Sequence, residues 1–323
     1  MRAEDKFMPK VSIVIPVYNG ADYLSEAIDS ALAQTYPNVE VVVVNDGSCD
    51  NGATEKVALS YGDRIRYFSK QNGGVSSALN YGIKHMTGEY FSWLSHDDKY
   101  EPQKVEESVM LLSGVSQREK CVALCGAYYI NTKSERIGQA KYAFESGSVY
   151  TGPEIVSYIL KNGVINGCCM LIPKRAFEEC GGFHEGLRYN QDALMWYQIF
   201  GAGYEMVTDV SKQYVMYRIH ANQTSKTRRD LLLRDSAELT RIISPLFEKL
   251  STKQNNLLYL NAVKQAKSNC LEAARVALDY AKRAGVLTAA MQMKVYGYML
   301  YGAVRQFLRQ VYHRLFVGAK KRV

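Results

Sequence analysis

The sequence lacks the features that mark several large protein classes. No apolar run reaches the roughly 18 residues that a membrane-spanning helix needs. Residues 1–10 are polar and carry no apolar core of a signal peptide. No Gly-Lys-Ser/Thr phosphate loop occurs, and the glycine spacing of dinucleotide-binding enzymes is missing after the first predicted strand. We therefore expect a cytoplasmic protein that is neither membrane-spanning nor a P-loop or dinucleotide-binding enzyme.

Cysteine usage and charge narrow the class further. The seven cysteines match no zinc framework or disulfide scaffold, so we expect free, reduced thiols. Of the 323 residues, 47% are hydrophobic, which is enough for one large domain or one domain with an appendage. The net charge of +8 is compatible with phosphate-bearing substrates, an anionic membrane surface or nucleic acid, and basic residues gather at 226–229 and 305–322.

Short apolar runs alternate with stretches of helical periodicity up to about residue 217. The expected strands are 11–16, 39–44, 65–68, 90–94, 122–129, 168–173 and 207–217, and the expected helices are 21–34, 54–61, 75–85, 102–112, 152–161, 173–180 and 192–201, with a hairpin or long loop at 131–149. This alternation predicts an α/β fold with a doubly wound, mostly parallel sheet. From residue 228 onward, helical periodicity continues almost without glycine or proline, so several helices are expected.

The most informative stretch is 91–98, where an apolar run ends in Asp97 and Asp98. Carboxylates at the carboxyl end of a buried strand lie where open α/β sheets bind ligands. Mg²⁺ and Mn²⁺ use one or two carboxylates together with waters and substrate phosphates. The alternative is an acidic turn that caps the following helix. Polar groups also follow three other strands, at 16–19, 45–48 and 70–74, which predicts a shared cleft at one sheet edge.

A set of ordered motifs covers roughly residues 9–225. They are Val11–Gly20, Val42–Asp50, Asn72–Asn80, Asp97-Asp98 with Pro102, Gly181-Gly182-Phe183, Gln191–Trp196 and Tyr217–His220 with Gln223 and Ser225. This set closely resembles family-two glycosyltransferases of the GT-A fold, a Rossmann-like fold of nucleotide-diphospho-sugar transferases. The resemblance implies an inverting transfer of a sugar from a nucleotide diphosphate, with UDP favoured, to an acceptor hydroxyl, assisted by Mn²⁺ or Mg²⁺.

The resemblance also implies roles for individual residues. Those expected to bind the donor are Pro16, Tyr18, Asn19, Asp46, Asn72, Ala78, Asn80, Asp97 and Arg218. Asp46 matches the carboxylate that contacts the donor base, and Tyr18 is a candidate stacking surface. Gly73 and Gly74 permit close approach of the backbone. Asp46 and Asn72 are also ordinary turn-forming residues, and that reading stays open at this point.

Asp97, Asp98 and His220 match the residues that hold the metal on the diphosphate. Ser95 stands where the family usually has a first aspartate, so metal binding can rest on a single carboxylate. Asp192 matches the general base that takes the acceptor proton. The glutamate that usually precedes it is replaced here by Gln191, which can still hold an acceptor hydroxyl. Asp192 can equally cap the helix that it begins.

We divide the chain into a GT-A catalytic domain at 1–225 and a helical region at 226–323. The end of the chain, from Val286, mixes aromatic residues with arginine and lysine, so it can lie on an anionic membrane surface. Packing on the catalytic domain or against a second copy is the alternative. A peripheral location on the inner face of the cell membrane would suit a lipid-linked glycan acceptor in bacterial surface-polysaccharide synthesis.

Two other function classes remain to be weighed. A sugar nucleotidyltransferase would have a glycine-rich loop with arginine and lysine after the first strand, but the sequence has Val17-Tyr18-Asn19-Gly20 there. A non-catalytic nucleotide-sugar-binding or scaffold protein is the second alternative, because Ser95 and Gln191 stand where the family usually has acidic residues. We expect no nucleic-acid partner, because basic and aromatic residues are interleaved only in the tail. The particular sugar, acceptor, linkage and oligomeric state are not encoded in any recognisable motif.

Overall fold

The structure is a computed structural model that describes residues 7–221, 223, 229–251 and 256–312. By their internal contacts, the residues form two compact units: 1–155 with 164–228, and 156–163 with 229–323. The predicted division at residue 225 falls outside the described residues and assigns 156–163 to the first part, whereas these residues group with the second unit. As a statement about domains, that division stays a prediction.

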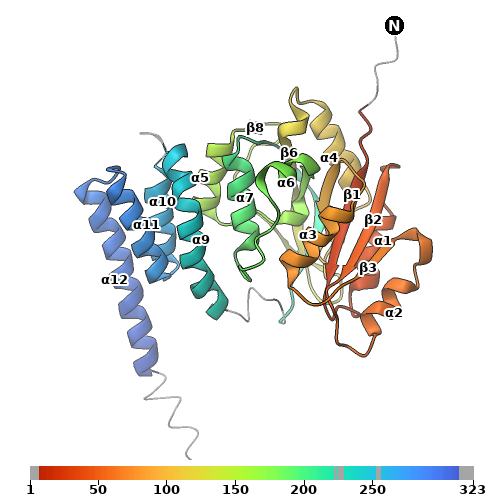
Figure 1. The fold of residues 1–323 in the computed structure, drawn as a ribbon, viewed down its shortest axis with the longest axis horizontal. Helices are drawn as coiled ribbons and strands as arrows, with labels where there is room; N and C mark the ends of the chain where they lie inside the picture. Colours follow the sequence, from red (N-terminus) through yellow and green to blue (C-terminus); the bar gives the residue numbers. More distant parts are fainter. Residues whose placement is uncertain (1–6, 222, 224–228, 252–255, 313–323) are drawn as a thin grey trace, which may run out of the picture. The chain divides into compact units, whose positions relative to one another are not determined.

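The amino-terminal half of the first unit is a run of parallel strands and helices. Its elements are β1 (Val11–Val17), α1 (Leu24–Leu32), β2 (Val39–Asn45), α2 (Ala53–Leu59), β3 (Arg66–Ser69), α3 (Val75–His85) and β4 (Tyr90–Trp93). The strands lie in the order β3-β2-β1-β4, and all their pairings are parallel (Figure 1). All seven residues of β1 are buried, as expected of an apolar strand covered on both faces.

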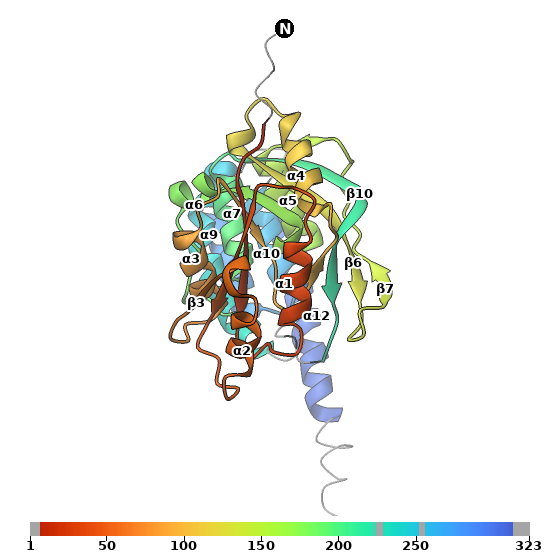
Figure 2. The same ribbon diagram turned by 90° about the vertical axis from the view of Figure 1, so that its right-hand side faces the viewer.

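The remaining strands add short antiparallel pairings, so the sheet as a whole is mixed. The elements are β5 (Lys99–Tyr100), α4 (Lys104–Ser113), β6 (Cys121–Ile130), β7 (Arg136–Gln139), β8 (Val149–Tyr150), α5 (Gly152–Asn162), β9 (Met170–Pro173), α6 (Lys174–Cys180), α7 (Gln191–Gly201) and β10 (Glu205–Arg218). The sheet continues from β4 as β9-β6-β10-β5, with β9 antiparallel to both β4 and β6. Figure 2 shows β6, β7 and β10 together at one edge.

One buried carboxylate joins the amino-terminal ends of the parallel strands. Glu40, on β2, accepts hydrogen bonds from the Ser12 hydroxyl of β1 and from Thr87, and forms a 2.9 Å ion pair with Arg66 of β3. The carboxylate side chain is only 9% exposed. Burial opposes its ionisation, but the hydrogen bonds from Ser12, Thr87 and Arg66 outweigh that effect and lower the pKa of Glu40 to about 2.

The second unit contains a bundle of helices. Its elements beyond residue 228 are α9 (Arg229–Leu250), α10 (Leu257–Lys267), α11 (Leu271–Arg283) and α12 (Ala289–Tyr312). Its core consists of Ala262, Ala266, Ala274, Ala277, Leu278 and Val295, and the small alanines let α10 and α11 approach closely. Among the described residues, none of the helices combines the length and apolar character needed to cross a bilayer. The expected helical character of this region is confirmed.

Candidate functional site

The two adjacent carboxylates after β4 have different environments. Asp98 is only 1% exposed, and its Oδ1 accepts a hydrogen bond of 2.9 Å from the backbone N–H of Arg218. The Cys168 thiol lies 3.5 Å from its Oδ2. Burial, together with the neighbouring Asp97 carboxylate, raises the pKa of Asp98 well above its usual range. Asp98 therefore joins the turn after β4 to the end of β10, and its role as a metal ligand stays a prediction.

Asp97 instead pairs with a histidine at a partly accessible position. Its Oδ2 lies 2.9 Å from Nε2 of His220, which follows β10, and both side chains are 17% exposed. Carboxylate oxygen and imidazole nitrogen are both metal ligands. No cluster of three or more His, Cys, Asp or Glu side chains able to hold a metal occurs within the described part of the chain. This pair thus fits a cation that takes its other ligands from water and a bound diphosphate.

Arg218 was predicted to contact the donor, but its guanidinium is enclosed by protein. The residue is 0% exposed, and Nε donates to the backbone oxygen of Asp97 at 2.7 Å. Its other nitrogens reach Ser134 and Glu26, and the guanidinium stacks 4.3 Å from the Tyr23 ring. A buried charge needs this many partners to offset its lost hydration. In this structure, Arg218 positions the Asp97 turn, and its direct contact with the donor stays a prediction.

Asp46 lies at the end of β2 with its carboxylate 2% exposed. Lys70 donates to Oδ1 at 2.8 Å, while the backbone N–H groups of Gly73 and Gly74 donate at 3.0 Å and 2.6 Å to Oδ1 and Oδ2. Gly74 has a φ of +88°, a conformation that other residues rarely adopt, and this turns its N–H toward Asp46. Asp46 therefore shapes the loop before α3 in this structure.

Tyr18 and Asn19 form an exposed cluster with Cys49 after β1 and β2. The Tyr18 ring is 46% exposed, and its hydroxyl lies 3.3 Å from Cys49 Sγ. Asn19 Nδ2 lies 3.5 Å from the same sulfur, and Asn19 Oδ1 accepts the Cys49 N–H at 2.8 Å. The contacts with Tyr18 and then Asn19 lower the pKa of the Cys49 thiol. The ring of Tyr18 is thus held open to solvent, as a stacking surface requires.

The other predicted donor residues differ in exposure, because Asn72 is exposed and Asn80 is partly exposed, whereas Pro16 and Ala78 are buried. Pro16 and Ala78 are buried in β1 and α3, and their contact with the donor stays a prediction. Asn72 donates to the backbone oxygen of Asp46 at 2.8 Å. Asn80 forms two hydrogen bonds with the backbone of Phe183: its Nδ2 donates to the carbonyl oxygen at 2.9 Å, and its Oδ1 accepts the N–H at 2.8 Å. Asn72 and Asn80 therefore hold loops in position.

Asp192 and Gln191 begin α7. Asp192 is partly exposed, and its Oδ1 accepts the backbone N–H of Ala193 at 2.7 Å, so it contributes to the helix start as well. Gln191 is 9% exposed, and its side-chain oxygen has no hydrogen-bond partner among the described residues. An unsatisfied buried oxygen is costly, and such groups are common where a ligand donates the missing bond.

Sequence reasoning missed Arg188, which links two loops of the site. Its guanidinium donates a 2.7 Å hydrogen bond to the backbone oxygen of Gly73, beside the Asp46 carboxylate. The loop before α7, the helix whose first turn carries Asp192, is thereby tied to the loop before α3. No motif distinguishes this arginine from other exposed arginines, because its partner is 115 residues away in the sequence.

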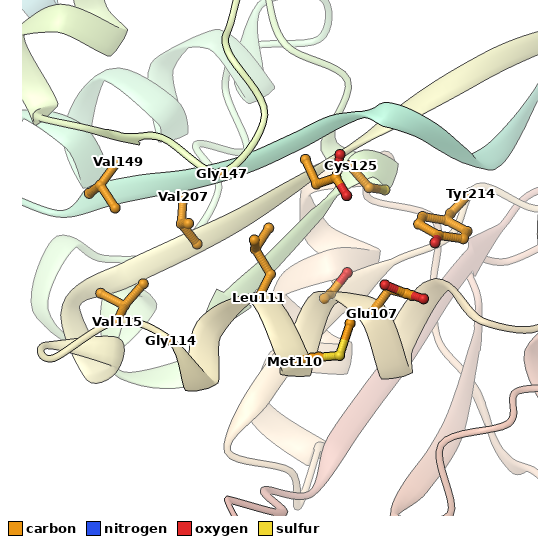
Figure 3. Close-up of a pocket in the computed structure, with 12 residues that line it drawn as sticks. Glu107, Met110, Leu111, Gly114, Val115, Cys125, Gly147, Val149, Val207 and Tyr214 are labelled. Atoms are coloured by element: carbon orange, nitrogen blue, oxygen red, sulfur yellow. The ribbon is translucent and has the colours of Figure 1, made fainter.

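A hollow of about 330 Å³ lies elsewhere in the first unit. Its walls come from α4, β6, β8, β10 and the loop before β8, and they include Met110, Leu111, Val149, Val207 and Tyr214 (Figure 3). None of the predicted donor, metal or base residues lines it. Because its lining is largely apolar and lacks basic side chains, the hollow is a poor match for a diphosphate.

Comparison with known proteins identifies the class. A glycosyltransferase family 2 model ("Glycosyl transferase family 2") matches residues 12–181. The structure of Staphylococcus aureus TarS 1–349 in complex with UDP-GlcNAc has a TM-score of 0.70 at 16% identity, covering 93% of this chain and 92% of that one. The fold is therefore the GT-A fold, with a mixed sheet flanked by helices.

Curated relatives agree with the family model. An uncharacterized glycosyltransferase of Rickettsia typhi is 41% identical over 268 residues, which covers 82% of this chain and 80% of that protein. One from Rickettsia bellii is 53% identical over 196 residues, or 60% of this chain, but the match spans only 28% of the relative's own length. The chain belongs to glycosyltransferase family 2.

Proposed function

We propose that this protein transfers a sugar, with inversion, from a UDP-sugar to a hydroxyl group of a glycan acceptor. The observation that carries the proposal is the partly exposed Asp97–His220 pair, which lies beside the buried Asp98 in a family 2 domain. A paired acid and imidazole at the carboxyl end of a strand suit a cation bound to a diphosphate.

The donor is inferred from the loops around Tyr18 and Asp46. The exposed Tyr18 ring offers a stacking surface for a base, and the loop held by Asp46 supplies backbone groups beside it. Solved TarS structures contain UDP-GlcNAc and UDP, which favours a uridine donor for this chain as well. Mn²⁺ or Mg²⁺ would be held by Asp97 and His220 and, when bound, would offset the negative charge of the departing diphosphate.

We assign the general base to Asp192. Its carboxylate takes the proton of the acceptor hydroxyl while that oxygen bonds to the anomeric carbon and the bond from this carbon to the diphosphate breaks, which releases UDP. Gln191 accepts a hydrogen bond from another acceptor hydroxyl through its unsatisfied oxygen. Arg188 ties the loop that leads into α7, where both residues lie, to the loop before α3.

The acceptor class is a glycan or a lipid-linked glycan of the bacterial cell envelope. This assignment rests on the resemblance of the chain to its family, because no described residue distinguishes one acceptor from another. A non-catalytic sugar-nucleotide-binding protein is the second candidate, and the substitutions at Ser95 and Gln191 are the observations in its favour.

Release of UDP from a panel of UDP-sugars tests the proposal. The assay contains Mn²⁺ and simple glycan acceptors, and calorimetry on the same samples reports donor binding. We expect one UDP-sugar to bind in a Mn²⁺-dependent manner and to be turned over. Binding without turnover over the whole acceptor panel would favour the non-catalytic candidate, and absence of both would overturn the donor assignment.

A further inference from the structure

The longest helix of the second unit, α12, has two opposite apolar faces. One face packs into the bundle: Val295 is fully buried, and Tyr298 and Met299 pack against the same core. Further along the same face, Gly302 packs against Asn269. A Cβ atom at position 302 would lie only 2.5 Å from Asn269 Oδ1, which is too close. The inward face of α12 is thus fully explained by the packing of its own unit.

The opposite face of α12 is apolar and exposed. Met293, Leu300 and Phe307 follow one another at seven-residue intervals, about two helical turns, and are 68%, 68% and 63% exposed. Beside them on the same side lie Tyr296, Tyr301, Val304 and Leu308, each between 47% and 67% exposed. Large side chains seldom gather on an exposed helix face unless that face has a partner.

The charged residues of α12 itself are all cationic. The sequence from Tyr280 to Val323 contains no aspartate or glutamate, whereas lysine and arginine occur throughout it. Lys294 and Arg305 lie on α12 itself, and Lys282 of α11 donates a 2.9 Å hydrogen bond to the Tyr296 hydroxyl. Apolar side chains and tyrosines on a helix whose charged residues are all lysine and arginine complement a surface of anionic headgroups over hydrocarbon.

We propose that the outward face of α12, formed by Met293, Tyr296, Leu300, Tyr301, Val304, Phe307 and Leu308, binds the surface of an anionic lipid bilayer. The helix lies in the plane of the headgroups and does not cross the bilayer. A second copy of the chain is a poorer partner, because pairing two such helices brings lysine and arginine together with no acidic residue to offset them. The predicted membrane contact of the tail beyond residue 312 lies outside the described residues.

Vesicle flotation tests this proposal with the full-length protein. The probes are vesicles of pure phosphatidylcholine and vesicles that contain equal parts of phosphatidylcholine and phosphatidylglycerol. We expect binding to the anionic vesicles only, and we expect binding to weaken when salt is raised to about 1 M, where the Debye length falls to about 3 Å. No binding, or equal binding to both vesicle types, would overturn the proposal.

Substitutions then locate the contact. Leu300→Glu and Phe307→Glu should each reduce partitioning about tenfold, since each removes a buried apolar side chain from the interface. Leu59→Glu and Met110→Glu, two residues of the first unit that are 58% exposed, are matched controls and should leave binding unchanged. Arg305→Glu retains the apolar face and should weaken binding only at low salt. The alternative is that a second copy of the chain covers this face. That result would be a concentration-dependent dimer without lipid that the Leu300→Glu substitution dissociates.

Discussion

Two carboxylates lie at opposite ends of the parallel part of the sheet, and they differ in the hydrogen bonds and ion pairs that they form with the protein. Glu40, at the amino-terminal end, accepts hydrogen bonds from two strands and a loop and forms an ion pair with Arg66. Asp97, at the carboxyl end, has His220 as its side-chain partner within the described ranges and keeps 17% of its side chain exposed. The first arrangement stabilises the sheet, and the second leaves capacity for a ligand. The predictions below separate these two roles.

The largest effect is expected at Asp192. Asp192→Asn keeps the shape and helix-starting hydrogen bond of the side chain but removes its basicity. Turnover should fall by about 10³-fold, which corresponds to about 4 kcal/mol in the barrier, while UDP binding stays the same. Steady-state UDP release and calorimetry measure the two quantities. Asp63→Asn, at an exposed position, is the control, and unchanged turnover in Asp192→Asn would remove Asp192 from its assigned role.

The second effect is on stability. Folding lowers the pKa of Glu40 from 4.5 to about 2, so its ionised form stabilises the protein above pH 4.5, and this stabilisation is lost as the pH falls toward 2. Glu40→Gln should therefore reduce the free energy of unfolding by about 2–3 kcal/mol at pH 7 and by much less near pH 2.5.

Urea unfolding at both pH values measures the change, with Glu178→Gln, an exposed glutamate, as the control. A difference of the same size at pH 7 and pH 2.5 would contradict the role given to the Glu40 charge. At a temperature where the variant is folded, UDP binding should equal that of the native chain, because Glu40 lies at the end of the strands away from the site.

The third effect separates Asp97 from Asp98. Asp97→Asn should weaken Mn²⁺-dependent UDP binding about tenfold with little change in melting temperature, since it removes an accessible ligand. Asp98→Ala should mainly lower the melting temperature, because it leaves the buried backbone N–H of Arg218 without its acceptor. Thermal unfolding and metal titrations on both variants provide the measurements. The assignment would be contradicted if the Asp98 variant lost Mn²⁺-dependent UDP binding and the Asp97 variant lost thermal stability.

The smallest effect is expected at Gln191. Gln191→Ala removes an oxygen without a partner in the described structure, so the fold loses little, whereas acceptor binding loses one hydrogen bond. The acceptor KM should rise about tenfold or less, with the donor KM unchanged. Steady-state kinetics with each substrate varied in turn provide the measurement, and an equal rise in both constants would argue against a specific acceptor contact.

The sequence predicted most of the first unit because its strands are apolar runs and its helices have regular apolar spacing. It did not predict the direction of β9, since burial on both faces looks the same for parallel and antiparallel strands. Glu40 is the polar residue within the predicted strand 39–44, and the sequence did not predict its partners, because the hydrogen bonds that compensate its burial come from other strands.

At the site, the sequence predicted which residues gather but not which of them remain accessible. Asp97 and His220 were matched to the metal, and the structure brings them to 2.9 Å. Arg218 and Asn80 were expected to face the donor, but their partners lie 121 and 103 residues away in the sequence and enclose them. Contacts between residues so far apart in the sequence leave no pattern in the neighbouring residues. The sequence alone therefore does not distinguish a structural from a functional polar residue within a family motif.

The central claim is that the carboxyl edge of the sheet binds a nucleotide diphosphate through a metal held at Asp97. Isothermal titration calorimetry of UDP against the native chain and Asp97→Asn, with Mn²⁺ and with chelator, tests it most directly. We predict that UDP binds the native chain at least tenfold more tightly with Mn²⁺ and that Asp97→Asn removes most of this gain. Equal UDP affinity in all four titrations would contradict the claim.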